Sequence, residues 1–345
     1  MSLKNKHILI IRLSAMGDVA MTVPVIRNLI KQNKGVKITI LTRAFFTPFF
    51  TEFDNVTVYT PELKGKHKGI IGLFKLFKEL IKLNIDVVAD LHNVIRSNIL
   101  VSFFRLRGIK CVQLKKGRKD KKKLTELNEN KILFSLKTMH ERYADVFKRL
   151  GFSMNLSSIY NLVKKEIPYH FQKEFNDSKL IGIAPFAAYK GKAFPIKKIK
   201  SLVKELSDKN YCKVLLFGGG DVEKKLLEDL AKDYTNVFSM VKKGTFEEEL
   251  NIISNLDVMI SMDSGNGHIA AMYNVPVITI WGVTHPCLGF TPFNQSIENQ
   301  ILPDLKEYPL IPTSAYGKEY PKEYLNCFET ILISDIIKVV NTYTK

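Results

Sequence analysis

Asp18 is the first side chain whose setting suggests chemistry. It ends the loop Arg12-Leu-Ser-Ala-Met-Gly-Asp18, which follows a β-rich apolar run at residues 7–12. Ligands of open α/β sheets bind outside the carboxyl ends of the strands, where a carboxylate can accept a proton from an attacking hydroxyl group. Aspartate is also a common helix cap, and a helix is expected to begin near Val19. The loop by itself leaves both roles open for Asp18, general base and helix cap.

A second group of candidate residues follows the apolar run Val258 to Met262. Small residues and a hydroxyl group open a helix there, and the free N–H groups at such a helix start favour phosphate binding. The candidate donor-binding residues of this segment are Asp263, Ser264, Gly265, Gly267 and His268. For His268, a purely structural role in positioning the loop stays open.

The same segment matches the pattern G-x-G-x-x-A through Gly265, Gly267 and Ala270. In dinucleotide-binding proteins this pattern is followed about 20 residues later by an acidic residue that holds the ribose. No Asp or Glu lies between Gly265 and Ser296, and the segment comes late in the chain. A nicotinamide cofactor is therefore disfavoured.

Two further candidate segments end apolar runs in the second half of the chain. Lys190 and Lys192 follow the run Leu180 to Ala184, and an ammonium group there can neutralise a diphosphate leaving group without a metal ion. The segment Phe217-Gly-Gly-Gly-Asp-Val-Glu223 has glycines that would let a ligand approach the backbone. Ordinary solvation of lysines and ordinary turn formation explain these features nearly as well.

Several motifs of other enzyme classes are absent from the sequence. It has no D-x-D motif of metal-dependent sugar transfer, no H-E-x-x-H, no G-x-S-x-G and no Walker motif. The four cysteines are widely separated and form no metal-binding pattern. We therefore predict no bound metal and no cofactor, and we expect a reducing, cytoplasmic environment.

The elements that must position these residues alternate between strand and helix, which predicts parallel sheets and an α/β fold. The expected strands are 7–12, 37–42, 87–91, 180–184, 213–217, 258–262 and 277–281, and the expected helices are 23–31, 196–207, 222–233, 246–254 and 328–344. The 345 residues suit two domains of about 150 residues each. The polar stretch 156–178 separates them, so we predict an N-terminal domain at 1–165, a C-terminal domain at 175–327 and a C-terminal helix at 328–345, with a cleft between the domains.

The chain is strongly basic, with 52 Lys and Arg against 34 Asp and Glu and a net charge of +18. Such a charge attracts nucleic acids, anionic membranes and phosphorylated substrates alike. The basic block Lys115 to Lys123 is either a solvated loop or a contact for anionic groups. The run Gly72 to Lys82 is amphipathic at helical spacing, which is typical of helices on membrane surfaces and of helices packed on a sheet. No apolar run is long enough to span a membrane.

Taken together, the ordered motifs resemble glycosyltransferase family 9, the lipopolysaccharide heptosyltransferases. The opening Ile8-Leu-Ile-Ile-Arg-Leu-Ser-Ala-Met-Gly-Asp18-Val, followed by Pro24, is similar to the start of that family. The segments Asp257-Val-Met-Ile-Ser-Met-Asp263-Ser-Gly-Asn-Gly-His268 and Trp281-Gly-Val-Thr-His-Pro286 are similar to its second signature. The similarity extends to His140-Glu-Arg-Tyr-Ala, before the interdomain stretch.

The resemblance implies a GT-B fold, in which two Rossmann-like domains with parallel sheets face a central cleft. It implies metal-independent, inverting transfer of heptose from ADP-heptose, with the acceptor held mainly by the first domain and the nucleotide sugar by the second. By position, Asp18 matches the catalytic base, Lys192 the lysine on the donor phosphates and Glu223 the ribose-binding glutamate. Ala187 and Ala188 stand where many members carry hydroxyl groups, so the donor identity stays open.

The acceptor implied by the resemblance is an anionic lipid, such as the lipid A–Kdo core, at the cytoplasmic face of the inner membrane. Arg96 and Arg142 are candidate contacts for it, and the basic surface would keep the enzyme peripherally attached. Alternatives are another GT-B enzyme with a different donor, an epimerase, or a non-catalytic protein that binds nucleotide sugars or nucleic acid. A nucleic-acid partner is not expected, because Lys115 to Lys123 includes no aromatic residue for stacking on bases.

Overall fold

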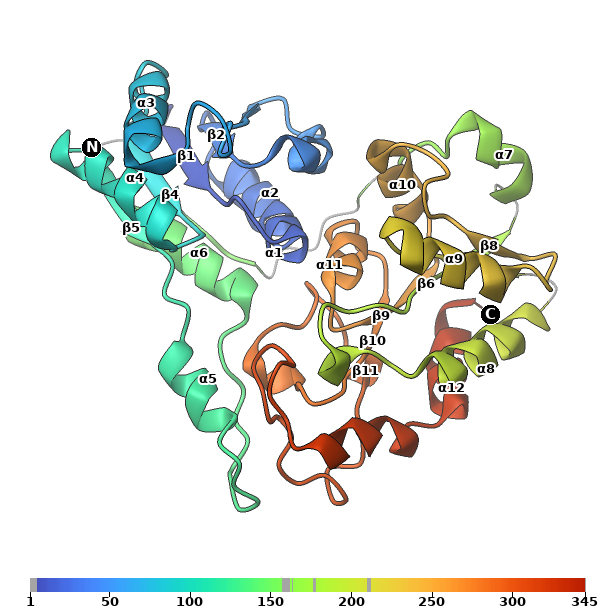
Figure 1. Ribbon diagram of the computed structural model, residues 1–345. Coiled ribbons are helices and arrows are strands. Elements are labelled where there is room, and N and C mark those ends of the chain that lie inside the picture. The colour runs from blue at the N-terminus through green and yellow to red at the C-terminus, as the bar shows by residue number, and fades with distance from the viewer. Residues whose placement is uncertain (1–4, 157–161, 163, 176–177, 210–211, 345) are drawn as a thin grey trace. The chain divides into compact units, whose positions relative to one another are not determined.

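The computed structural model describes residues 5–156, 162, 164–175, 178–209 and 212–344 (Figure 1). The described residues form two compact units, each with its own parallel β-sheet. Unit 1 consists of described residues within the ranges 1–116 and 139–160. Unit 2 consists of described residues within the ranges 117–138 and 161–345. The predicted boundary stretch 156–178 lies partly outside the described residues.

Unit 1 has a five-stranded sheet in the order β3-β2-β1-β4-β5. Its strands are β1 (His7–Ile11), β2 (Lys37–Leu41), β3 (Val56–Tyr59), β4 (Val87–Asp90) and β5 (Lys110–Gln113). Every residue of the central strand β1 is buried, as expected for a strand covered on both faces. In the register of the sheet, Ile8 lies opposite Ile38 of β2 and opposite Val87 of β4.

Helices cover both faces of this sheet. They are α1 (Met16–Ala20), α2 (Thr22–Gln32), α3 (Gly69–Ile81), α4 (Ile95–Leu106), α6 (Met139–Leu150) and the 3-10 helix η1 (Ala44–Phe50). Helices α3 and α4 pack together, and α2 packs with α6. Leu73, Leu76 and Leu80 of α3 join Leu9 and Ile11 of β1 in one apolar cluster. The amphipathic run at 72–82 is therefore a crossover helix that packs on the sheet.

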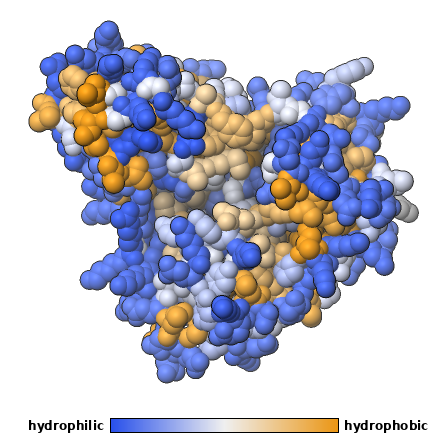
Figure 2. Space-filling model, in the orientation of Figure 1, coloured by the Kyte–Doolittle hydropathy of each residue, from blue (hydrophilic) through white to orange (hydrophobic). Residues whose placement is uncertain are grey.

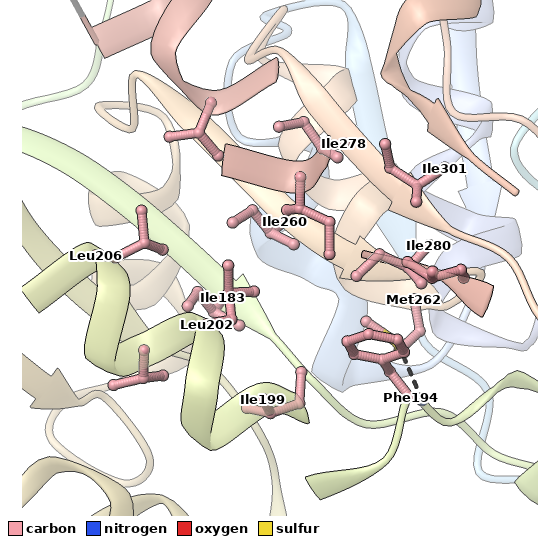
Figure 3. Close-up of a cluster of buried hydrophobic side chains, with 14 of the residues drawn as sticks. Ile183, Phe194, Ile199, Leu202, Leu206, Ile260, Met262, Ile278, Ile280 and Ile301 are labelled. Atoms are coloured by element: carbon pink, nitrogen blue, oxygen red, sulfur yellow. Dashed lines mark hydrogen bonds between the residues drawn. The ribbon is translucent and has the colours of Figure 1, made fainter. Parts of the chain in front are cut away.

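Unit 2 has a six-stranded sheet in the order β11-β10-β9-β6-β7-β8. Its strands are β6 (Lys179–Ala184), β7 (Cys212–Leu216), β8 (Val237–Ser239), β9 (Val258–Met262), β10 (Val277–Ile280) and β11 (Gln300–Ile301). Its helices are α5 (Arg118–Leu124), α7 (Tyr169–Phe175), α8 (Ile196–Ser207), α9 (Gly220–Ala231), α10 (Phe246–Ile253), α11 (Gly265–Met272) and α12 (Ile333–Thr344), with 3-10 helices η2 (Lys190–Lys192), η3 (Pro286–Leu288), η4 (Ile297–Asn299) and η5 (Lys322–Thr330). Figure 3 shows apolar side chains of the central strands packed against Ile199, Leu202 and Leu206 of α8.

The predicted strands and helices are confirmed with shifts of one or two residues, except at the C-terminal end. The helix expected at 328–344 begins only at Ile333, because Ile331 is extended and separates α12 from η5. Phe328 is buried and packs on Phe194, which fixes the chain before α12 starts. Helix α12 packs on α8, β9 and β10, so it belongs to unit 2.

Residues 117–138, which the sequence analysis assigned to the first domain, pack with unit 2. Leu124 forms a buried cluster with Cys287 and Leu288, and the Leu136 N–H donates to the Cys287 carbonyl oxygen at 2.8 Å. Part of the basic block is the helix α5 instead of a loop, and its Lys121 is buried with Nζ 3.8 Å from the Phe290 ring centroid. Residues 117–138 therefore join unit 2 because their apolar side chains pack on residues near position 288, far along the chain.

The visible face of the molecule is mostly hydrophilic, with hydrophobic groups gathered in a few places (Figure 2). Within the described residues, no helix is both long and apolar enough to cross a membrane.

Candidate active site

Each sheet has a topological switch point, which is the pair of neighbouring strands where the direction of the connections reverses. In unit 1 the chain goes from β1 outward through β2 to β3 and then returns to β4 on the other side of β1. In unit 2 the corresponding neighbours are β6 and β9. Crevices at the carboxyl ends of such strand pairs are the usual ligand sites of open α/β sheets. The loops after β1, β4, β6 and β9 are therefore where binding residues are expected.

Asp18 lies in the loop and helix that follow β1, at the third position of α1. Its Oδ2 atom forms an ion pair with Nη2 of Arg12 and accepts a long hydrogen bond from the Ala15 N–H, at 3.3 Å. The side chain is 28% exposed, so the carboxylate is held and still accessible to a ligand. Helix α1 begins at Met16 with Ala15 at the N-cap position, so Asp18 is the third helical residue, and its carboxylate caps the helix start through the Ala15 N–H.

Arg12 is a buried residue that ties this carboxylate to the rest of the sheet. Its Nη1 donates to the Leu91 carbonyl oxygen after β4 at 2.6 Å, and its guanidinium lies 5.8 Å from the ring centroid of Tyr143. The fully buried Tyr143 also donates from its hydroxyl group to the Asp18 carbonyl oxygen at 3.4 Å. Arg12 and Tyr143 lie within the motifs of the sequence, but only the fold brings them to Asp18, so the sequence indicates no role for them.

His92 is a further buried residue at this switch point, one that the sequence did not single out. It follows β4, where the Asp90 carboxylate accepts hydrogen bonds from the His92 and Asn93 N–H groups, both at 2.9 Å. Burial, together with the positive charge of Arg12, lowers the pKa of His92 to about 4. The imidazole is therefore neutral at physiological pH.

Lys192 and Asp263 meet at the switch point of unit 2. Lys192 ends η2 after β6, Asp263 follows β9, and Lys192 Nζ lies 3.0 Å from Asp263 Oδ2. Asp263 Oδ2 also accepts a hydrogen bond from the buried Thr284 hydroxyl group at 3.0 Å. The side chains of Lys192 and Asp263 are only 15% and 5% exposed. The structure thus brings together two predicted residues and adds Thr284, which the sequence analysis quoted in a motif without assigning it a role.

Glycines allow the chain to pack closely around Lys192. A Cβ atom at Gly317 would lie 2.5 Å from Lys192 Cγ, and Gly317 has a φ of +74°, which favours glycine. A Cβ atom at Gly191 would lie 2.6 Å from Val283 Cγ2 and 2.8 Å from the Gly317 carbonyl oxygen. Gly317 therefore lies directly against the stem of Lys192, while the ammonium group is paired with Asp263.

Helix α11 starts next to this pair, and its first residues have different roles. Ser264 is the N-cap residue, and its buried Oγ has no hydrogen-bond partner within the described part of the chain. Gly267 serves packing, because a Cβ atom there would lie 2.4 Å from Ser261 Oγ of β9. His268 is buried in the first turns of α11. Gly265 is the first residue of α11, so its N–H is one of the four free groups at the helix start.

The remaining predicted residues of unit 2 lie at the same edge of the sheet. Lys190 is exposed at the start of η2. Glu223 lies in the first turn of α9 and accepts a hydrogen bond from the Gly219 N–H at 2.7 Å. This contact orders the glycine turn, so part of the Glu223 carboxylate is already occupied.

The two candidate acceptor residues lie on different helices of unit 1. Arg96 is exposed in the first turn of α4. Arg142 is half-buried on α6 and donates to the Lys115 carbonyl oxygen at 3.2 Å. Across the described residues, no group of three or more His, Cys, Asp or Glu side chains is placed to hold a metal ion.

Comparison with known proteins identifies a family that this chain resembles. Residues 73–313, more than half of the chain, match the sequence profile described as Glycosyltransferase family 9 (heptosyltransferase). The chain is 27% identical over 293 residues to lipopolysaccharide heptosyltransferase 1 of Campylobacter coli, in an alignment that covers 80% of this chain and 84% of that protein.

Solved structures show the same arrangement of elements. The glycosyl transferase family 9 protein of Veillonella parvula superposes with a TM-score of 0.73 at 18% identity, covering 100% of this chain and 98% of its own. E. coli heptosyltransferase WaaC with ADP-2-deoxy-2-fluoro heptose superposes with a TM-score of 0.68 at 18% identity, covering 97% and 99%. The predicted α/β fold of GT-B type, with two domains, is confirmed.

Proposed function

Because the chain belongs to glycosyltransferase family 9, we propose that it transfers heptose from ADP-heptose to the inner core of lipopolysaccharide. The heptosyltransferase relative and the E. coli enzyme with an ADP-heptose analogue support this choice of donor and acceptor. The observation that carries the proposal is the placement of the candidate residues. A held but accessible carboxylate lies at the switch point of one sheet, and a shielded lysine beside a helix start lies at the switch point of the other.

In the proposed reaction Asp18 takes the proton from an acceptor hydroxyl group. The hydroxyl oxygen forms a bond to the anomeric carbon of the donor, from the face opposite the diphosphate, so the configuration inverts. The bond from that carbon to the diphosphate oxygen breaks, and ADP leaves with the electron pair. The carboxylate acts through position, because Arg12 fixes its direction from the buried side.

Lys192 and the start of α11 are proposed to stabilise the departing diphosphate without a metal ion. A shielded ammonium group and free N–H groups at a helix N-terminus both favour negative charge there. The buried hydroxyl of Ser264 supplies a further donor at this place. The proposed donor site is completed by Lys190, Glu223, Asp263, Gly265, Gly267 and His268. The proposed acceptor contacts are Arg96 and Arg142. We further propose that the enzyme works in the cytoplasm, attached peripherally to the inner membrane.

The test of this function is transfer by Asp18→Ala. With ADP-heptose and a deacylated, water-soluble lipid A–Kdo acceptor, we expect turnover to fall by at least about a hundredfold, since general-base catalysis contributes that much. ADP binding, measured by calorimetry, should stay unchanged. Asp229→Ala removes another carboxylate, one that is 66% exposed and paired with the surface residue Lys232, and should behave as wild type. Full turnover by Asp18→Ala would refute the assignment of the base, and epimerised nucleotide sugar formed without acceptor would refute sugar transfer.

A further inference from the structure

Helix α3 exposes three large apolar side chains near its start. Ile70 is 66% exposed, Ile71 76% and Phe74 42%. Single exposed apolar residues are common on soluble proteins, but three within five residues are a patch. Ile70 and Phe74 are four residues apart and lie on one side of the helix, next to Ile71. The opposite side, with Leu73, Leu76 and Leu80, is buried in the core. The packing of α3 on the sheet therefore does not need Ile70 and Ile71, and Phe74 contacts Phe77 and Phe103 with only part of its ring.

Lysines precede and follow this apolar patch in the sequence. The exposed lysines of the preceding loop and of α3 are Lys64, Lys66, Lys68, Lys75 and Lys78. The two acidic residues of the segment are already engaged, since Lys66 Nζ lies 3.5 Å from both Glu62 and Glu79, and Glu79 also accepts a hydrogen bond from Tyr59. Lys78 Nζ lies 4.9 Å from the ring centroid of Phe74. The surface thus combines exposed apolar groups with an excess of positive charge.

The loop before α3 is held firmly against the helix. A Cβ atom at Gly72 would lie 2.3 Å from the carbonyl carbon of His67, so only glycine allows this approach. His67 is buried, and its Nδ1 accepts a hydrogen bond from the Glu62 N–H at 2.9 Å. The lysines of the loop and the isoleucines of the first helical turn are therefore presented together on a fixed surface.

The patch lies at the edge of the sheet that carries Asp18. Helix α3 runs from the carboxyl end of β3 to the amino end of β4, so its first turn is at the carboxyl edge of the sheet. Helix α4 starts at the same edge with Ile95, which is 81% exposed, and Phe103 of α4 packs on Phe74 at 5.4 Å between ring centroids. Figure 2 shows hydrophobic groups among hydrophilic ones in the region where Figure 1 places α3 and α4.

We propose that Ile70, Ile71 and Phe74, with the exposed lysines of the same segment, dock unit 1 onto an anionic lipid bilayer. Apolar side chains buried at the level of the headgroups and lysines that face anionic lipids are the two contributions by which amphipathic helices bind membranes. The docked edge is the one that carries Asp18, so a lipid-linked acceptor would reach the base without leaving the membrane. This last point rests on the proposed function, whereas the docking itself does not.

The experiment measures co-sedimentation of the full-length protein with vesicles of phosphatidylcholine, with and without phosphatidylglycerol. Wild type should bind the anionic vesicles and release them as salt is raised. The double variant Ile70→Ser, Ile71→Ser should partition about tenfold more weakly, because it loses two apolar side chains from the interface. Lys75→Ser, Lys78→Ser should weaken binding to anionic vesicles about fivefold per lysine and leave the phosphatidylcholine result unchanged.

Leu106→Ser is the matched control. Leu106 is 84% exposed at the end of α4, which lies at the opposite edge of the same sheet, so its loss should not change vesicle binding. The proposal would be overturned if the Ile70→Ser, Ile71→Ser variant bound vesicles as strongly as the wild type. It would also be overturned if the wild type did not bind anionic vesicles. An altered oligomeric state of this variant with unchanged vesicle binding would assign the patch to self-association instead and would equally overturn it.

Transfer to a deacylated, water-soluble acceptor separates this inference from the proposed function. The Ile70→Ser, Ile71→Ser variant should keep that activity and lose only activity on acceptor embedded in vesicles. If the wild type transfers no heptose to the soluble acceptor, the proposed function fails, while the vesicle result still decides whether the surface docks on membranes.

Discussion

The ion pair of Lys192 and Asp263 combines a binding role with a structural one. Asp263 is nearly removed from water, and its carboxylate is satisfied by Lys192 and by Thr284. Removing the cationic partner of a buried carboxylate lowers the free energy of unfolding far more than breaking a surface ion pair does. A replacement of Lys192 alone therefore cannot distinguish loss of donor binding from loss of stability.

A double replacement separates these two effects. We expect Lys192→Ala to weaken donor binding and also to lower the free energy of unfolding. Breaking a fully buried ion pair costs about 3–5 kcal/mol. The loss should be smaller here, because the Lys192 side chain is partly exposed. Lys192→Ala with Asp263→Asn should regain much of the stability and none of the donor affinity. Urea unfolding and calorimetry with ADP give the two quantities. Recovery of ADP affinity in the double variant would show that Lys192 does not contact the donor.

His285 makes the stability of unit 2 depend on pH. Its Nδ1 accepts a hydrogen bond from the Cys287 N–H at 3.1 Å, which requires that nitrogen to be unprotonated. Burial, with a smaller effect of Lys131, lowers the pKa of His285 from 6.5 to about 4. Since the unfolded chain binds this proton more readily than the folded one, stability is complete above pH 6.5 and falls as the pH drops from there to about 4.

The expected loss over that window is about 3 kcal/mol, from roughly 1.4 kcal/mol for each unit of pKa difference. His285→Asn keeps a side-chain acceptor for the Cys287 N–H but does not titrate, so its stability should depend less on pH. The chain has one tryptophan, Trp281, which is fully buried in unit 2, so its fluorescence follows urea unfolding of this unit. Equal pH dependence in wild type and His285→Asn would contradict the assignment.

At the scale of elements, the start of α11 is set by its contact with β9. Gly267 faces Ser261 so closely that any side chain at position 267 would meet the Ser261 hydroxyl group. From the sequence, this glycine was predicted to bind the donor, as expected for a glycine-rich helix start. Its contact with Ser261 also limits how near the helix comes to the strand, and thereby how Ser264 and the free N–H groups are placed.

We expect Gly267→Ala to lower the free energy of unfolding by about 1–3 kcal/mol, the usual cost of overpacking. Adding Ser261→Ala should restore most of it, because the atom then nearest to the new Cβ is 3.4 Å away, which is ordinary contact. Urea unfolding of the wild type, both single variants and the double variant gives the coupling between the two positions. Purely additive effects would show that the contact does not limit the packing of α11.

At the scale of the whole molecule, the two units are not two consecutive pieces of chain. Residues 117–138 pack with unit 2, although residues of unit 1 precede and follow them. Lys131 Nζ donates to the carbonyl oxygens of Leu310 at 2.6 Å and Pro312 at 2.7 Å, and Leu124 is buried beside Leu288. A replacement in the first half of the sequence should therefore destabilise the unit formed mainly by the second half.

Leu124→Ala tests this assignment. We expect it to lower the free energy of unfolding reported by Trp281 by about 2–5 kcal/mol, since it removes a side chain that is only 1% exposed. Leu100→Ala, in the core of unit 1, is the matched control and should change the Trp281 signal less. An unchanged Trp281 transition in Leu124→Ala would contradict the packing of residues 117–138 with unit 2.

The sequence by itself determined the strands, most helices, the α/β class and the resemblance to a family, because these depend on local periodicity and on short motifs. The run His7–Ile11 is apolar throughout, and Ile196–Ser207 has a helical period that needs no knowledge of its neighbours. The candidate residues Asp18, Lys192 and Asp263 were also visible, since each follows an apolar run at a place where ligands bind.

Only the tertiary structure decided which side chains meet. Arg12 reaches Asp18, Thr284 reaches Asp263, and residues 117–138 join unit 2, in each case through contacts between segments that are separate in sequence or that depend on the exact path of a loop. Hydrogen bonds and close packing are satisfied only for one arrangement of the elements in space, and periodicity contains no information about that arrangement. The sequence therefore identified the candidate groups, and the fold decided how each of them is held.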